Sequence, residues 1–114
     1  MRKLGLLFMT LITSSVGYAN KETVLLDVRT QEEWNEKHIE GSTLVDFKQT
    51  DFKDKISRLD KDQTYEIYCR SGNRSGSAVK MMAEMGFKNV HNAGTIENVL
   101  GKTKSKCVGP SCSK

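Results

Sequence analysis

Short apolar runs alternate along the chain with segments whose apolar residues recur at helical spacing. The run from Val24 to Val28 is almost continuously apolar, which is typical of a strand covered on both faces, as in a parallel sheet. Tyr65–Tyr68 is rich in β-favouring residues and predicts a central strand. Two shorter strands are predicted over 42–45 and 87–91.

Three helical segments separate these strands. The first, from about 30 to 37, begins with a capping box of Thr30 and Glu33. The second, over 51–59, carries one apolar stripe. The third, over 75–85, ends at a glycine that suits the position just past a helix.

This alternation predicts an α/β domain, built on a small open parallel sheet with helices on both faces. Beyond the last strand we expect residues 92–94 to turn away, followed by one helical turn over 96–100. In open sheets of this kind, ligands bind beyond the carboxyl ends of the strands. Cys69 follows the central strand and therefore lies at such an end.

The first 19 residues have the pattern of a secretory signal peptide. Two basic residues precede an uncharged, mostly apolar stretch over 4–16, and small residues stand at 17 and 19. The apolar stretch is shorter than the ~20 residues of a membrane-spanning helix, so cleavage after Ala19 is favoured over an uncleaved anchor. The predicted organisation is a signal peptide (1–19), one domain (20–101) and a flexible C-terminal tail with a cysteine pair (102–114), in a periplasmic protein.

Charge excludes some partners. The formal net charge of +4 falls to +2 once Arg2 and Lys3 leave with the signal peptide. This is too small to indicate nucleic-acid binding or stable membrane association. No group of His, Cys and carboxylate residues has metal-ligand spacing, so we expect no metal and no cofactor. We expect a monomer.

The chain has three cysteines, and an exported chain meets an oxidising compartment where thiols pair. Cys107 and Cys112 flank a Gly-Pro turn signal, which allows them to close a small disulfide loop. The odd cysteine, Cys69, is then a free thiol, and a free thiol in a secreted protein is a candidate reactive group.

The stretch Cys69–Ser75 concentrates the candidate chemistry. Loop amides and a helix N-terminus together form an anion-binding concavity that favours a thiolate. Arg70 and Arg74 add fixed positive charge, and Gly72 lets the loop curve tightly. Further side-chain donors come from Ser71, Asn73 and Ser75. The loop is predicted to bind a small anion and attack it through sulfur, with a covalent intermediate. A buried, inert cysteine is the alternative.

Three motifs together resemble a rhodanese (thiosulfate sulfurtransferase) domain. They are Asp27-Val28-Arg29 with Glu33 and Trp34, then His38-Ile39-Glu40-Gly41-Ser42, then the Cys69–Ser75 loop. The resemblance covers residues 24 to about 100, and the short exported chain is most similar to single-domain rhodaneses of the phage-shock type.

The resemblance implies a function. Cys69 would take a sulfane sulfur from a small anionic donor such as thiosulfate, become a persulfide, and pass the sulfur to cyanide or to a small-molecule or protein thiol. Amides of residues 70–75 would cradle the persulfide, while Arg70 and Arg74 would attract the donor and stabilise departing sulfite. Structural roles near the site would fall to Asp27, Arg29, Glu33, His38 and Gly41.

Two other functions stay open. Dual-specificity phosphatases resemble this fold, but their loop has one more residue between cysteine and arginine than the four that separate Cys69 from Arg74. The chain could also be a periplasmic thiol-exchange or sulfur-carrier binding module in which Cys69 works with Cys107 and Cys112. An inactive binding domain is disfavoured because such domains usually lack the cysteine.

Overall fold

The computed structural model describes residues 22–112; the predicted signal peptide lies outside them. Within this range, no helix is long and apolar enough to cross a membrane. The elements follow one another in this order: β1 (Val24–Asp27), α1 (Gln31–Glu36), β2 (His38–Ile39), β3 (Thr43–Leu44), α2 (Phe52–Ser57), β4 (Thr64–Cys69), α3 (Asn73–Glu84), β5 (Asn89–Thr95), α4 (Ile96–Lys102), β6 (Cys107–Val108).

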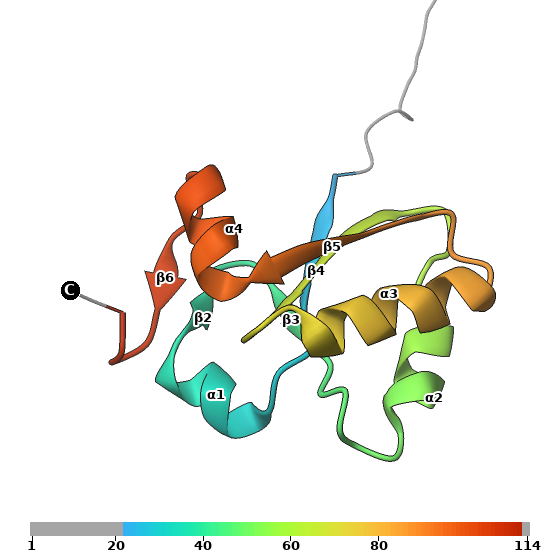
Figure 1. Ribbon diagram of the computed structural model, residues 1–114, viewed down its shortest axis with the longest axis horizontal. Helices are drawn as coiled ribbons and strands as arrows, with labels where there is room; N and C mark the ends of the chain where they lie inside the picture. The colour runs from blue at the N-terminus through green and yellow to red at the C-terminus, as the bar shows by residue number, and fades with distance from the viewer. Residues whose placement is uncertain (1–21, 113–114) are drawn as a thin grey trace, which may run out of the picture.

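A four-stranded sheet in the order β3-β1-β4-β5 forms the centre of the molecule (Figure 1). All three of its strand pairs are parallel. The helices that connect successive strands lie on both faces, which confirms the predicted α/β architecture. Strand β4 has a neighbour on each side, so its carboxyl end, at Cys69, lies in the middle of that edge of the sheet.

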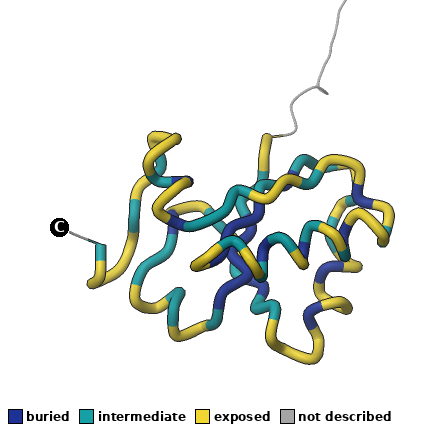
Figure 2. The backbone as a smooth tube through the Cα atoms, in the orientation of Figure 1, coloured by how far each residue is buried: buried dark blue, intermediate teal, exposed yellow. Residues whose placement is uncertain are grey.

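Two apolar cores lie on the sheet, and buried positions concentrate around β1 and β4 (Figure 2). One core contains Ile67 and includes side chains of α2 and α3; the other contains Tyr68 and includes side chains of α4. Successive residues of a strand point to opposite faces, so a strand between two cores needs apolar residues at almost every position. This explains the continuous apolar runs in the sequence.

Strand β5 differs from its prediction. The strand predicted over 87–91 is confirmed for residues 89–91, whereas the turn predicted at 92–94 is wrong, because residues 92–94 continue the strand to Thr95. The register slips by one residue at this point: Ile67 is opposite Asn92, whereas Tyr68 is opposite Gly94. Polar residues and a glycine are tolerated here because β5 is an edge strand with a bulge, and a glycine in such a strand commonly marks the bulge.

The helix boundaries follow local signals. The capping box of Thr30 and Glu33 is present and starts α1, as predicted. Helix α3 begins two residues earlier than predicted, because Gly72 in the left-handed conformation (φ +95°) serves as its N-cap. Gly86 adopts φ +102° just past the same helix, as the sequence indicated.

The segment after α4 contains regular structure. Strand β6 pairs antiparallel with β2, and a disulfide joins Cys107 to Cys112, so this predicted cysteine pairing is confirmed. The amide of Ser111 also donates to the carbonyl of Glu36 at the end of α1. The flexible tail expected over 102–114 therefore does not hold for the disulfide loop, whose two-residue strand is too short to show a periodic pattern.

Candidate active site

Cys69 is the last residue of β4, and its sulfur lies in a cradle formed by the start of α3. The Sγ atom accepts hydrogen bonds from the amides of Gly72 (2.9 Å) and Ser75 (3.4 Å). The Oγ of Ser75 is also 3.4 Å from Sγ. Cys69 is a free cysteine with none of its surface exposed. The strand end, the loop and the helix start thus converge on one sulfur atom.

The cradle makes this sulfur acidic. Burial by itself raises the pKa of the Cys69 thiol, because a charged group is disfavoured away from water. Hydrogen bonds from the Ser75 side chain and from the amides of Ser75, Gly72 and Ser71 outweigh burial, so the net pKa is lowered. The positive N-terminal end of the twelve-residue helix α3 favours the thiolate further. The thiolate is the nucleophilic form of cysteine.

Gly72 is required by the geometry of the cradle. Its positive φ turns its amide toward Sγ, and that backbone conformation is one that side chains with a Cβ rarely adopt. A Cβ added at Gly72 would lie 3.7 Å from the Cα of Gly94, which is an ordinary contact. The cost of substitution at Gly72 would therefore come from backbone strain and not from a clash.

Asn92 on β5 completes the cradle, and the sequence analysis missed it. Its Oδ1 accepts from Ser75 Oγ (2.6 Å) and from the Gly94 amide (2.9 Å), while its Nδ2 donates to the Gly72 carbonyl (3.2 Å). Asn92 was expected in a turn. A usable signal existed, because Asn92 lies near the carboxyl end of a strand next to β4, where polar residues of parallel sheets gather.

The two arginines of the loop have different surroundings. Arg74 forms a two-pronged ion pair with Glu33 of α1 (2.9 and 3.2 Å). Arg70 is exposed and, within residues 22–112, forms no ion pair. It lines a cavity of about 300 Å³ whose other walls come from Arg29, Glu33, Glu36, Lys37, Ile96, Glu97 and Ser111.

The remaining predicted site residues lie at the loop surface. Ser71 and Asn73 are exposed, and the Oγ of Ser71 accepts from the Asn73 amide (3.4 Å). A substrate-binding role for Arg70, Ser71, Asn73 and Arg74 stays a prediction. Gly72 and Ser75, by contrast, contact the sulfur of Cys69 directly.

Ion pairs and stacked rings support the site from the side of α1, as the resemblance implied for Asp27, Arg29 and Glu33. Arg29 and Asp27 form a buried pair, in which Arg29 Nη2 lies 2.8 Å from Asp27 Oδ2. His38 stacks on Trp34 and donates from Nδ1 to the Trp34 carbonyl (2.9 Å). These contacts hold α1 and β2 beside the cradle.

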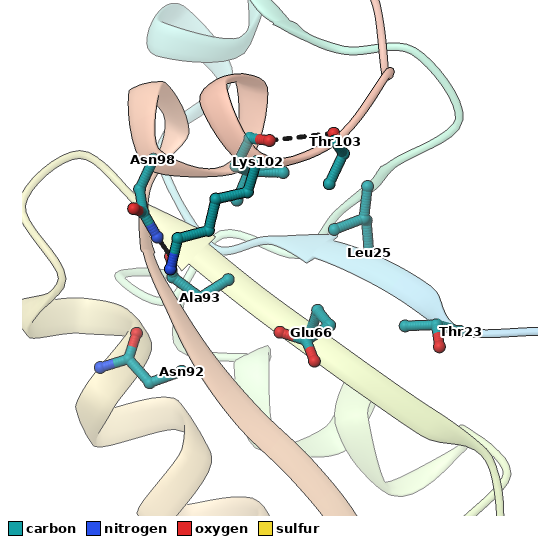
Figure 3. Close-up of a pocket in the computed structure, with 9 residues that line it drawn as sticks. Thr23, Leu25, Glu66, Asn92, Ala93, Asn98, Lys102 and Thr103 are labelled. Atoms are coloured by element: carbon teal, nitrogen blue, oxygen red, sulfur yellow. Dashed lines mark hydrogen bonds between the residues drawn. The ribbon is translucent and has the colours of Figure 1, made fainter.

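A second cavity, of about 350 Å³, lies between α4 and the sheet (Figure 3). Polar groups of Glu66, Asn98 and Lys102 line it together with Leu25 and Val99, and Asn92 lies at its margin. Among residues 22–112, no group of three or more His, Cys, Asp or Glu side chains is arranged to hold a metal ion.

The Glu33–Arg74 pair gives a pH-dependent prediction. The hydrogen bond that Arg74 donates to Glu33 lowers the pKa of Glu33 to about 2, although burial acts in the opposite direction. A lowered folded-state pKa adds stability above the unfolded pKa of ~4.5, and this stability is lost as pH falls toward 2. Because both side chains are about one-fifth exposed, at 18% and 20%, we expect Glu33→Gln to lower the free energy of unfolding at pH 7 by about 1–2 kcal/mol.

Urea unfolding between pH 7 and pH 2.5 tests this expectation. Glutamine at this position still fits the capping box with Thr30, so the substitution isolates the ion pair. Glu36→Gln, an exposed change in the same helix, is the matched control and should cost less than ~0.5 kcal/mol. A cost for Glu33→Gln that stays constant over this pH range would show that the pair contributes nothing through its charge.

Taken together, the fold and the site define an α/β domain that presents a cradled cysteine of lowered pKa at the carboxyl edge of a parallel sheet. The family model of the rhodanese-like domain matches residues 17–94 of the chain. The chain therefore belongs to the rhodanese-like domain family and is classed as a rhodanese-family sulfurtransferase.

Relatives cover most of the chain. The thiosulfate sulfurtransferase PspE of Escherichia coli K12 is 31% identical over 87% of this chain and 93% of its own length. The putative sulfurtransferase YtwF of Bacillus subtilis 168 is 40% identical over 77% of this chain and 84% of its own. A solved structure described as a rhodanese with anions from E. coli superposes with a TM-score of 0.64, at 27% identity, over 77% of this chain and 99% of its own.

Proposed function

We propose that the protein is a thiosulfate sulfurtransferase that carries sulfur on Cys69. The Cys69 thiolate attacks the sulfane sulfur of thiosulfate, or of a similar small anionic donor. A new bond forms between the two sulfurs while the donor's own S–S bond breaks, and sulfite leaves with the electron pair. Cyanide or a thiolate then attacks the outer sulfur, and the bonding electrons return to Sγ. Each step is a nucleophilic substitution that regenerates the enzyme.

The observation that carries this proposal is the set of donors around Cys69. Gly72 and Ser75 direct backbone amides at Sγ, which stabilises negative charge on sulfur before attack and again when the acceptor takes the outer sulfur. The exposed charge of Arg70, adjoining Cys69 in sequence, is suited to attracting an anionic donor. PspE, a relative along nearly its whole length, is named a thiosulfate sulfurtransferase.

The signal-peptide pattern over 1–19 extends the proposal to the compartment. An exported enzyme would work in the periplasm, where the Cys107–Cys112 disulfide would persist. The physiological acceptor there would be a small-molecule or protein thiol, with cyanide as the convenient laboratory acceptor.

Intact mass spectrometry before and after treatment with thiosulfate tests the proposal directly. The wild type should gain one sulfur atom, and cyanide should remove it, whereas Cys69→Ser should gain none. A wild type whose Cys69 is a free thiol but takes up no sulfur would sink the proposal for thiosulfate.

The second candidate, thiol exchange through Cys69, rests on the presence of the Cys107–Cys112 disulfide in the same chain. The position of the disulfide disfavours it, because β6, which carries Cys107, pairs with β2 and not with β4. Thiol mapping of the purified protein separates the two candidates. Exchange predicts mixed disulfides that include Cys69, while sulfur transfer predicts one disulfide and one free or persulfidated cysteine.

A further inference from the structure

Asn92 connects the two ends of the Cys69 cradle through its side-chain amide. Its Oδ1 receives hydrogen bonds from Ser75 Oγ (2.6 Å) and from the Gly94 amide (2.9 Å), and its Nδ2 donates to the Gly72 carbonyl (3.2 Å). Ser75 in turn lies 3.4 Å from the Cys69 sulfur. A chain of contacts therefore runs from β5 through Ser75 to the nucleophile.

The chemistry of these partners fixes the direction of each hydrogen bond. A backbone amide such as that of Gly94 can only donate, and a carbonyl such as that of Gly72 can only accept. Together they determine which end of the Asn92 amide is oxygen, a choice that Asn geometry alone leaves open. The atom facing Ser75 is thus an acceptor, so the Ser75 hydroxyl must donate to it.

A hydroxyl group has one proton, and this limits what Ser75 can do. While that proton is bound to Asn92 Oδ1, Ser75 offers only lone pairs to the sulfur of Cys69. A protonated thiol fits this arrangement, because its S–H can donate to Ser75 Oγ across the 3.4 Å contact. A thiolate does not, because it needs a donor where Ser75 presents an acceptor.

We propose that Asn92 is a positioning residue that holds the Ser75 hydroxyl proton while Cys69 is a thiol and releases it to the sulfur when the sulfur carries charge. The hydroxyl rotates between two acceptors, and no proton enters or leaves the group of residues through this rotation. The Gly94 amide remains bound to Asn92 Oδ1 in either state, so the oxygen is not left without a donor. The inference rests on the proposed role of Cys69 as the nucleophile.

Competition between Asn92 and Cys69 for the Ser75 hydroxyl proton predicts the direction in which the pKa of Cys69 shifts when Asn92 is removed. Asn92→Ala removes the competing acceptor, so Ser75 donates to the thiolate without giving up another hydrogen bond. We expect the titration midpoint of Cys69 to fall by about half to one pH unit, the order of one hydrogen bond. A purely structural Asn92 gives the opposite sign, because losing its bond to the Gly72 carbonyl would loosen the amides that stabilise the thiolate.

The midpoint is measured by the ultraviolet absorbance of the thiolate as a function of pH, with Cys69→Ser as the blank. This readout needs neither a sulfur donor nor access of a reagent, so it succeeds or fails independently of the sulfur-transfer proposal. Asn98→Ala is the matched control: Asn98 Nδ2 donates to the Ala93 carbonyl (2.7 Å) beside the same strand, and its loss should leave the midpoint unchanged.

A double substitution ties the effect to Ser75. In a Ser75→Ala background, Asn92→Ala should produce no further fall of the midpoint, because no hydroxyl proton remains to be released. A raised or unchanged midpoint in Asn92→Ala, or an equal fall in both backgrounds, would overturn the proposal. If Asn92→Ala does not fold, the near-isosteric Asn92→Asp replaces it. The introduced carboxylate should raise the titration midpoint of Cys69, and by more with Ser75 present than in the Ser75→Ala background. Equal shifts in the two backgrounds would contradict competition for the hydroxyl proton.

Discussion

Cys69→Ser should lose at least about a thousandfold in kcat/KM for the transfer of sulfur from thiosulfate to cyanide. A serine hydroxyl stays protonated at neutral pH, and an oxygen at this position cannot form a persulfide. The amides of Gly72 and Ser75 would still find an acceptor atom in the smaller side chain. The fold should therefore survive, and the loss can be assigned to chemistry by comparing steady-state formation of thiocyanate with the thermal unfolding curve.

The paired control removes the other two sulfurs. Cys107→Ser with Cys112→Ser opens the disulfide loop, which we expect to cost about 2 kcal/mol of stability because the closed loop is short. Sulfur transfer should persist in this double variant. Activity that disappears when the pair is removed, with Cys69 still in place and the fold intact, would favour thiol exchange over sulfur transfer.

Much of the environment of Cys69 could be predicted because it depends on local signals. A β-favouring strand, a cysteine, a glycine and a helix follow one another between residues 64 and 84, and the strand, the glycine and the helix each have a clear local signal. The left-handed Gly72, the helix behind it and the amides aimed at Cys69 follow from that order. Continuous apolar runs likewise predicted a sheet with a core on each face.

The missing parts depend on contacts between distant segments. Glu33 lies 41 positions from Arg74, and the sequence supplies two charges without showing that they pair. Asn92 lies in a polar segment that contains a glycine and has the pattern of a turn. Only the pairing of β5 with β4 places Asn92 against Ser75. Strand β6 is two residues long and is held by β2 and a disulfide, so it has no sequence periodicity from which it could be predicted.

The second large effect concerns the buried Asp27–Arg29 pair next to the site. Arg29 Nε lies 2.9 Å and Nη2 2.8 Å from the Asp27 carboxylate oxygens, and Nη2 also donates to the Lys37 carbonyl (2.6 Å). Their side chains are 4% and 0% exposed. Burial by itself lowers the pKa of Arg29. The hydrogen bond to Asp27 and the negative charge of Asp27 together outweigh burial, so the net pKa is raised and the guanidinium stays charged.

We expect Arg29→Met to lower the free energy of unfolding by about 3–5 kcal/mol, because it leaves the Asp27 carboxylate buried without its counter-charge. The chain contains a matched control. Arg58 and Asp54 are the same residue types at the same 2.8 Å distance, but their side chains are 74% and 62% exposed. Arg58→Met should cost less than ~1 kcal/mol. Urea unfolding of both variants isolates burial as the variable.

A double-mutant cycle then separates two costs: the lost attraction between Asp27 and Arg29, and the burial of one charge without its partner. Asp27→Asn should destabilise on its own, since it leaves a buried guanidinium without its counter-charge. The double variant Asp27→Asn with Arg29→Met should cost less than the sum of the two single changes, because no unpaired charge remains in the interior. Equal costs for Arg29→Met and Arg58→Met would mean that water reaches the Asp27 carboxylate once Arg29 is gone. Water would then enter the region beside Cys69 more easily than its burial indicates. The assumption that a low dielectric constant strengthens the hydrogen bonds of the amide cradle would have to be rejected.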